Sequence, residues 1–163
     1  MERKNKKLFD NIDVENLFSQ WHKHVRLFTK DLNQDCVLEY IKNTKITHFD
    51  SSKHKEVLNF TNTNKCIEIL RNITEEKNKI NFFKLLKERD NLHPREYQRG
   101  INIEQIFESV KNDNYHPILF LELYKKHYII DGRTRLYCCI FLNKPAKVRI
   151  ITDYLLKRNC IED

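Results

Sequence analysis

The sequence predicts an α+β fold, a small mixed sheet with helices, preceded by an α-helical N-terminal region. Apolar residues recur at helical spacing through much of the first 90 residues. After residue 100, short apolar runs typical of strands alternate with segments of helical periodicity. Asparagine, glycine and proline stand at the junctions, where turns are expected. The order in this second half is helix, strand, turn, strand, turn, helix and strand.

The N-terminal elements are read from the spacing of apolar residues. This spacing predicts helices through residues 17–32 and 37–41. The segment 44–63 is polar and rich in asparagine, serine and threonine, so it is either loop or short strand. Thr74, followed by two glutamates, indicates the start of a further helix that continues to Leu86.

The C-terminal elements are bounded by clear breaks. Asn112 to Asn114 ends one helix, and Asn143 to Pro145 ends another. Proline at 117 opens a strand, a position where its missing N–H is tolerated. The expected helices are 103–110 and 136–142, and the expected strands are 116–121, 128–130 and 148–151.

A chain of 163 residues suits one domain, or a compact domain with an appended module. We expect residues 1–90 to form a mainly helical region that packs on the following domain, residues 91–163. This region would offer a surface for a protein partner. The five cysteines are odd in number and have no C-x-x-C spacing, which argues against a disulfide framework and favours the reducing cytoplasm. No apolar run is long enough to span a membrane.

The turn between the strand at 128–130 and the helix at 136–142 is the most informative segment. It reads Asp131, Gly132, Arg133, Thr134 and Arg135. The first N–H groups of a helix lack intrahelical partners, and the helix dipole favours negative charge there. With two arginines beside that helix start, the turn predicts a phosphate site. The alternative is structural: the aspartate caps the helix, the glycine supplies a positive φ, and the arginines are solvated.

The ordered set of segments resembles the ParB/sulfiredoxin superfamily over roughly residues 92–152. The segments that carry the resemblance read Glu108-Ser109-Val110-Lys111, Pro117-Ile118-Leu119-Phe120, Tyr128 to Arg135, and Val148-Arg149-Ile150-Ile151. The resemblance implies a phosphate-gripping scaffold. Its members include CTP-binding partition clamps, ATP-dependent sulfinic acid reductases, free serine kinases and proteins described as nucleases.

Residues of this turn that differ from the family pattern help to choose among these activities. Sulfiredoxins place a reactive cysteine in the phosphate turn, whereas this turn carries Arg133 and Thr134. Cys138 and Cys139 follow one turn into the helix, where at least one is expected to face the core. Partition proteins usually carry G-E-R-R, and here the acidic residue precedes the glycine instead. Asp131 before the glycine is similar to the serine kinase branch and to many ParB-like nucleases.

A polar loop, residues 92–100, is expected to face the same site. Pro94 and Gly100 bracket a stretch without helical periodicity, which is either a solvated loop or part of the phosphate cradle. The resemblance implies that Glu96 would orient or deprotonate a nucleophile. The donors that would add to the phosphate contacts are Arg95, Gln98 and Arg99.

These residues lead to three functional hypotheses. In the first, Asp131 holds Mg²⁺ and Glu96 acts on the nucleophile, so that the chain hydrolyses or transfers a phosphoryl group of ATP, ADP, CTP or nucleic acid. In the second, the turn only binds a nucleotide or DNA. The third is a small-metabolite kinase resembling free serine kinases. The net charge of +7 is spread along the chain and is compatible with nucleic-acid contact without requiring it.

Overall fold

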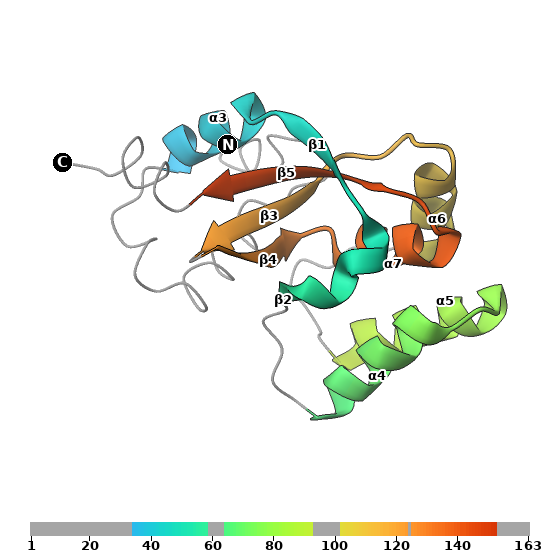
Figure 1. Cartoon of the computed structure of the whole chain (residues 1–163). Helices are drawn as coiled ribbons and strands as arrows, with labels where there is room; N and C mark the ends of the chain where they lie inside the picture. The colour runs from blue at the N-terminus through green and yellow to red at the C-terminus, as the bar shows by residue number, and fades with distance from the viewer. Residues whose placement is uncertain (1–33, 59–63, 93–101, 124, 153–163) are drawn as a thin grey trace, which may run out of the picture.

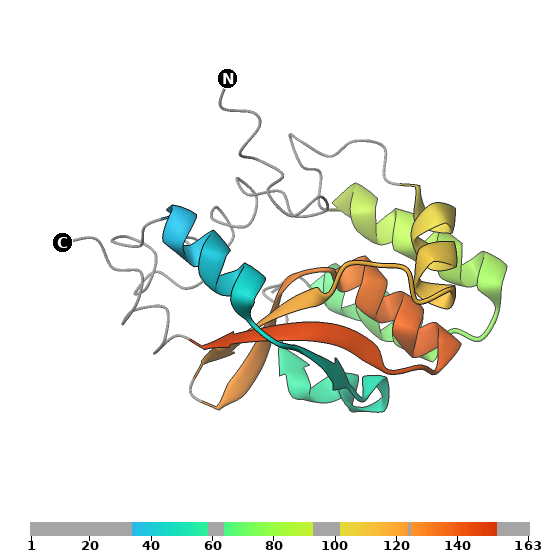
Figure 2. The same ribbon diagram turned by 90° about the horizontal axis from the view of Figure 1, so that it is seen from above.

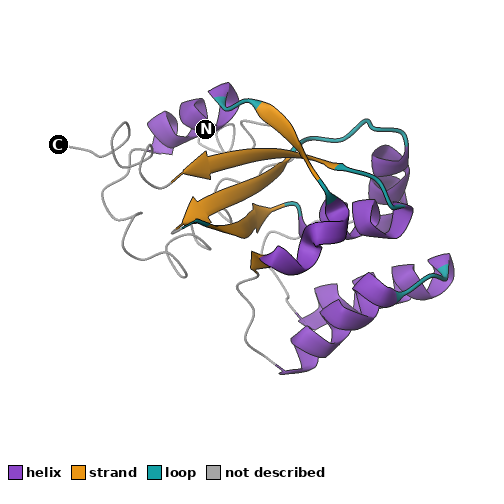
Figure 3. Ribbon diagram, viewed as in Figure 1, coloured by secondary structure: helices purple, strands orange, loops and turns teal. Residues whose placement is uncertain are grey.

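A computed structural model describes residues 34–58, 64–92, 102–123 and 125–152 of the chain. Figure 1 shows the elements along the chain, and Figure 3 separates helices from strands. The helices are α3 (Gln34–Asn43), the 3-10 helix η2 (Ser51–Glu56), α4 (Asn64–Glu75), α5 (Lys79–Leu92), α6 (Ile103–Lys111) and α7 (Arg133–Leu142). The strands are β1 (Ile46–Phe49), β2 (Val57–Leu58), β3 (Ile118–Leu123), β4 (Lys126–Asp131) and β5 (Ala146–Thr152).

The strands form one five-stranded mixed sheet in the order β1-β5-β3-β4-β2. The central strand β3 runs parallel to β5 and antiparallel to β4. At the edges, β1 is antiparallel to β5 and β2 is parallel to β4. The α+β class expected from the sequence is therefore confirmed.

The order of elements expected after residue 100 is the one observed, although α7 begins at Arg133 where the expected helix began at residue 136. The side chain of Asn102 caps α6 by accepting from the N–H of Gln105, and Asn112 is the C-cap of α6, as the asparagine-rich break predicts. Asn143 adopts a left-handed conformation at φ 53° and ends α7. Local periodicity and turn residues were sufficient here because each boundary carries its own chemical signal.

The polar segment 44–63 was expected to be either loop or short strand. It contains both edge strands, β1 and β2, so short strand is correct for these two stretches. Both strands join the sheet whose other strands all follow residue 117. The sheet therefore crosses the boundary expected at residue 90. Edge strands this short carry little periodicity of their own, and their pairing with β5 and β4 defines them.

The helix expected to start at Thr74 starts instead at Lys79. Thr74 lies in the last turn of α4, where its hydroxyl donates to the carbonyl of Arg71. The side chain of Asn78 accepts from the N–H of Asn81 and so caps α5. The expectation was wrong because the cap that starts this helix is Asn78, directly before Lys79, and not Thr74. The helix expected at 17–32 lies outside the described residues.

Helices α5, α6 and α7 lie on the same side of the sheet (Figure 2). Phenylalanines from all three helices meet there: the rings of Phe82 and Phe141 stack at a centroid distance of 4.5 Å, and Phe83 meets Phe107 edge-on at 5.1 Å. Such pairs stabilise the core beyond the area that they bury. This cluster fixes α7 over the sheet and so positions the turn that precedes it.

Candidate functional site

The turn between β4 and α7 is built around Gly132. Strand β4 ends at Asp131, α7 begins at Arg133, and Gly132 is the N-cap with φ 100° and ψ 28°. The positive φ expected of this glycine is confirmed. The alternative in which Asp131 caps α7 is wrong, because no described side chain caps this helix start. The helix therefore begins without the carboxylate that would occupy its N–H groups.

Asp131 and Arg135 contact each other across the turn. One carboxylate oxygen, Oδ2 of Asp131, accepts from Nη2 of Arg135 at 3.0 Å. Asp131 and Arg135 can form this contact because β4 and α7 meet at Gly132, which brings residues four positions apart together. The side chains are only 11% exposed for Arg135 and 22% exposed for Asp131. This partly buried pair is shielded from the solvent that weakens surface ion pairs.

Arg135 also joins the turn to the start of β3. Its Nη1 donates to the carbonyl of His116 at 2.6 Å and to the carbonyl of Pro117 at 3.3 Å. The sequence predicted that Arg135 would clamp phosphate together with Arg133. In the structure the Arg135 guanidinium makes three contacts within the protein, so it holds the turn in place. If a phosphate binds at this turn, Arg135 would position the turn and would not itself clamp the phosphate.

Arg133 and Thr134 occupy the first two positions of α7, and both are half-buried. At these positions the backbone N–H groups point out of the helix start, where the dipole is positive. Both residues were predicted to contact phosphate, and the structure places both at the N-terminus of α7. They place a guanidinium and a hydroxyl, both hydrogen-bond donors, at that end of the helix.

The predicted loop residues Glu96, Arg95, Gln98 and Arg99 lie outside the described residues. The pairing of Glu96 with Asp131 thus stays a prediction. Among described residues, no three or more histidine, cysteine or acidic side chains gather into a metal-binding group. A magnesium ion held between Asp131 and phosphate oxygens needs only one or two protein carboxylates. Asp131 accepts from Arg135 through Oδ2, and its part as a magnesium ligand stays a prediction.

Cys138 and Cys139 are fully buried free thiols in α7. The expectation that at least one faces the core is confirmed. Burial raises the pKa of Cys138 to about 12. Burial also raises the pKa of Cys139, although the hydroxyl of Tyr115, 3.6 Å from its Sγ, acts in the opposite direction. Protonated thiols out of reach of solvent are poor nucleophiles, which agrees with a structural part for both.

We expect the chain to lose stability in alkaline solution because of these thiols. An unfolded cysteine ionises near pH 8.5, whereas the folded pKa of Cys138 is about 12. A raised folded pKa contributes stability that is complete below pH 8.5 and is lost as the pH rises toward 12. Urea unfolding at pH 8 and at pH 10.5 should therefore give a lower free energy of unfolding at the higher pH. The Cys138→Ala variant should show a shallower decline, and an equal decline would contradict the linkage.

Sequence reasoning missed two surface pockets that are lined by described residues. The first, which we call the α4–α7 pocket, has a volume of about 370 Å³. Its lining residues are His54, Lys55, Val57, Ile67, Leu70, Arg71, Thr74, Glu75, Ile129, Leu136 and Tyr137. These come from four separate segments, so no local pattern in the sequence could bring them together. Leu136 and Tyr137 directly follow Arg135, which places the pocket beside the turn.

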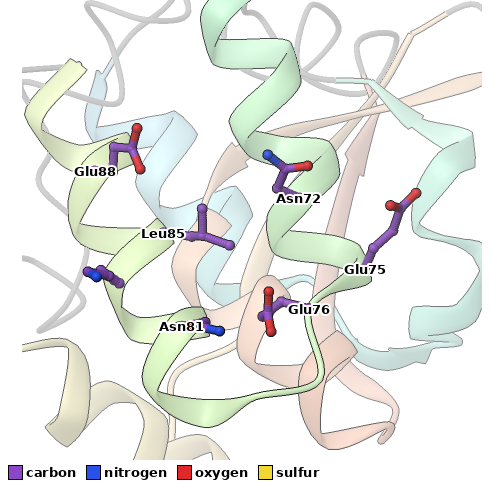
Figure 4. Close-up of a pocket in the computed structure, with 7 residues that line it drawn as sticks. Asn72, Glu75, Glu76, Asn81, Leu85 and Glu88 are labelled. Atoms are coloured by element: carbon purple, nitrogen blue, oxygen red, sulfur yellow. The ribbon is translucent and has the colours of Figure 1, made fainter.

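The second pocket lies between α4 and α5 and has a volume of about 340 Å³ (Figure 4). Three of its seven lining residues are glutamates: Glu75, Glu76 and Glu88. Figure 4 shows Asn72 on one helix and Leu85 and Glu88 on the other. Three carboxylates against the single cation of Lys84 make this pocket unfavourable for a phosphate.

The chain was compared with protein-family models, curated proteins and solved structures, and no match was found. No helix in the described ranges is both long and apolar enough to cross a membrane.

Proposed function

We propose that the chain binds a phosphate group of a nucleotide or nucleic acid at the Asp131 to Arg135 turn. One observation carries the proposal: α7 starts at a left-handed glycine with no capping side chain among the described residues, and Arg133 and Thr134 follow at once. A helix start of this kind presents N–H donors and a positive dipole end to an anion. The adjacent guanidinium would add a charge-assisted fork.

The order of elements supports a ParB/sulfiredoxin-like fold as part of this proposal. A helix, a strand opened by proline, a hairpin, the glycine turn, a helix and a final strand follow one another from α6 to β5. In this scheme Arg133 and Thr134 contact the phosphate, while Arg135 keeps β3, β4 and α7 together.

Binding is better supported than phosphoryl chemistry. Catalysis by this turn would use Asp131 to hold Mg²⁺ beside the bound phosphate. One oxygen of Asp131 already accepts from Arg135, and this ion pair competes with a metal for the carboxylate. A binding site requires no such exchange. We therefore place Mg²⁺-dependent hydrolysis or transfer of ATP, ADP or CTP second, with Glu96 as its proposed partner residue.

Thermal unfolding with candidate ligands tests the proposal. ATP, ADP, CTP, GTP and short DNA are each added with and without Mg²⁺, since a ligand of the native state raises the melting temperature. At about one hundred times the Kd, a ligand adds about 2.7 kcal/mol of stability, or roughly 5–10 °C for a chain of this size. We expect at least one of these ligands to give such a shift, and the Arg133→Ala variant to lose it.

Lys126→Ala is the matched control, since it removes one positive charge from the exposed start of β4, at the opposite end of the strand from the turn. It should keep the shift. Equal losses in both variants would indicate a general charge effect and contradict a site at the turn. A shift that needs Mg²⁺ and disappears in Asp131→Asn favours phosphoryl chemistry, and a metal-independent shift that survives this substitution favours binding alone.

A further inference from the structure

The α4–α7 pocket combines an apolar floor with a cationic rim. Val57, Ile129 and Leu136 are buried core residues that line the pocket and form its floor. Leu70 is half-buried beside them, and Ile67 is 48% exposed at the opening. Ile67 and Leu70 therefore leave apolar surface open to water above the buried floor, which is unfavourable. The pocket therefore offers a favourable place for an apolar group.

The rim carries a net positive charge. Lys55 from η2 and Arg71 from α4 line the pocket, and neither forms an ion pair with any other residue that the structure describes. Glu75 supplies the one carboxylate in the lining, so lysine and arginine together leave a net positive rim. Ligand pockets typically pair an apolar lining with a few polar groups that fix orientation. Here those groups select an anion.

We propose that the α4–α7 pocket binds a small organic anion with an apolar body, such as an aromatic carboxylate. The body lies on Val57, Leu70 and Leu136, and the carboxylate faces Arg71 and Lys55. The volume of about 370 Å³ lies at the lower end of the range for small-ligand sites, which fits one ring with a short chain better than a long lipid tail.

This site is separate from the phosphate site but shares a helix with it. None of the residues from Asp131 to Arg135 lines the pocket, so the inference does not rest on the proposed function. Leu136 and Tyr137 lie in the first turns of α7, which the phosphate turn opens. The pocket takes lining residues from α4 and from η2, and both elements contact α7.

The probe for this site is 4-phenylbutyrate, and its matched neutral control is 4-phenylbutyramide, which has the same apolar body without the charge. Titration of the full chain is followed by amide chemical shifts in a heteronuclear NMR spectrum. We expect saturable shifts at Leu70, Arg71, Leu136 and Tyr137 with the acid. The neutral amide should bind about tenfold more weakly, on the scale of one charge-assisted hydrogen bond.

Substitutions of exposed cations test whether binding depends on Lys55 and Arg71 at the rim or on positive charge in general. The Lys55→Gln, Arg71→Gln double variant should weaken 4-phenylbutyrate binding about tenfold or more, whereas Lys65→Gln, elsewhere on α4, should leave it unchanged. Arg133→Ala and an excess of inorganic phosphate should also leave it unchanged. The proposal is overturned if the acid gives no saturable shift, if acid and amide bind equally, or if Arg133→Ala abolishes binding while the double variant does not.

Discussion

Replacing Arg135 with methionine is expected to lower the free energy of unfolding by about 3 kcal/mol. Methionine keeps the apolar stem but removes the donors to the carbonyls of His116 and Pro117. It also leaves the carboxylate of Asp131, only 22% exposed, without its cation. An uncompensated charge in a partly buried place is costly, as are carbonyls that lose a donor. Chemical denaturation measures the difference.

A double-mutant cycle identifies the source of this loss. Asp131→Asn keeps a hydrogen-bond acceptor for Arg135 and removes the charge, so its effect should be smaller than that of Arg135→Met. In the combined variant the two losses should not add, because the contact they share is removed once. If Arg135→Met unfolds at the same denaturant concentration as the unmodified chain, Arg135 does not hold the turn and becomes available as a phosphate clamp.

Gly132→Ala is expected to destabilise the chain by about 1–3 kcal/mol. The glycine has φ 100°, a conformation that a residue with a Cβ adopts only with strain. An added Cβ would also stand 2.9 Å from Nη2 of Arg135 and 3.1 Å from Cγ1 of Ile118. Arg135 would have to move, and its contacts with Asp131 and the start of β3 would be lost with it. The melting temperature should fall, and any ligand shift at the turn should weaken.

Asn143→Gly is the control at the opposite end of the same helix. Asn143 has φ 53° and ends α7 in the left-handed region, where glycine is well tolerated. This substitution should change the free energy of unfolding by no more than about 0.5 kcal/mol. A loss in Asn143→Gly as large as that in Gly132→Ala would mean that any change at the ends of α7 is destabilising. The close approach of Arg135 would then not be the cause.

Arg135→Met and Gly132→Ala bear on function because both residues hold the turn in its conformation. Gly132 lets the guanidinium of Arg135 lie against the backbone, and the guanidinium ties the turn to β3. This leaves Arg133 and Thr134 at the helix start on a supported backbone. A preorganised anion site loses less conformational entropy on binding than a mobile loop does.

The sequence alone determined the elements from α6 to β5 and the glycine turn. Their apolar periods and their breaks at Asn112, Pro117, Gly132 and Asn143 act within a few residues, where backbone sterics and capping chemistry decide. For the same reason the positive φ of Gly132 could be expected from its place between a strand and a helix. The site residues Asp131 to Thr134 were predicted at a helix start, and two of them, Arg133 and Thr134, open that helix.

Only the tertiary structure decided what Arg135 contacts, where the edge strands lie and that the α4–α7 pocket exists. Arg135 donates to carbonyls 18 and 19 residues before it, and β1 pairs with β5 across about one hundred positions. The pocket joins η2 and α4 to the first turns of α7. Such contacts depend on which surfaces bury each other when the chain collapses, and short polar segments such as 44–63 carry no periodic signal of that choice.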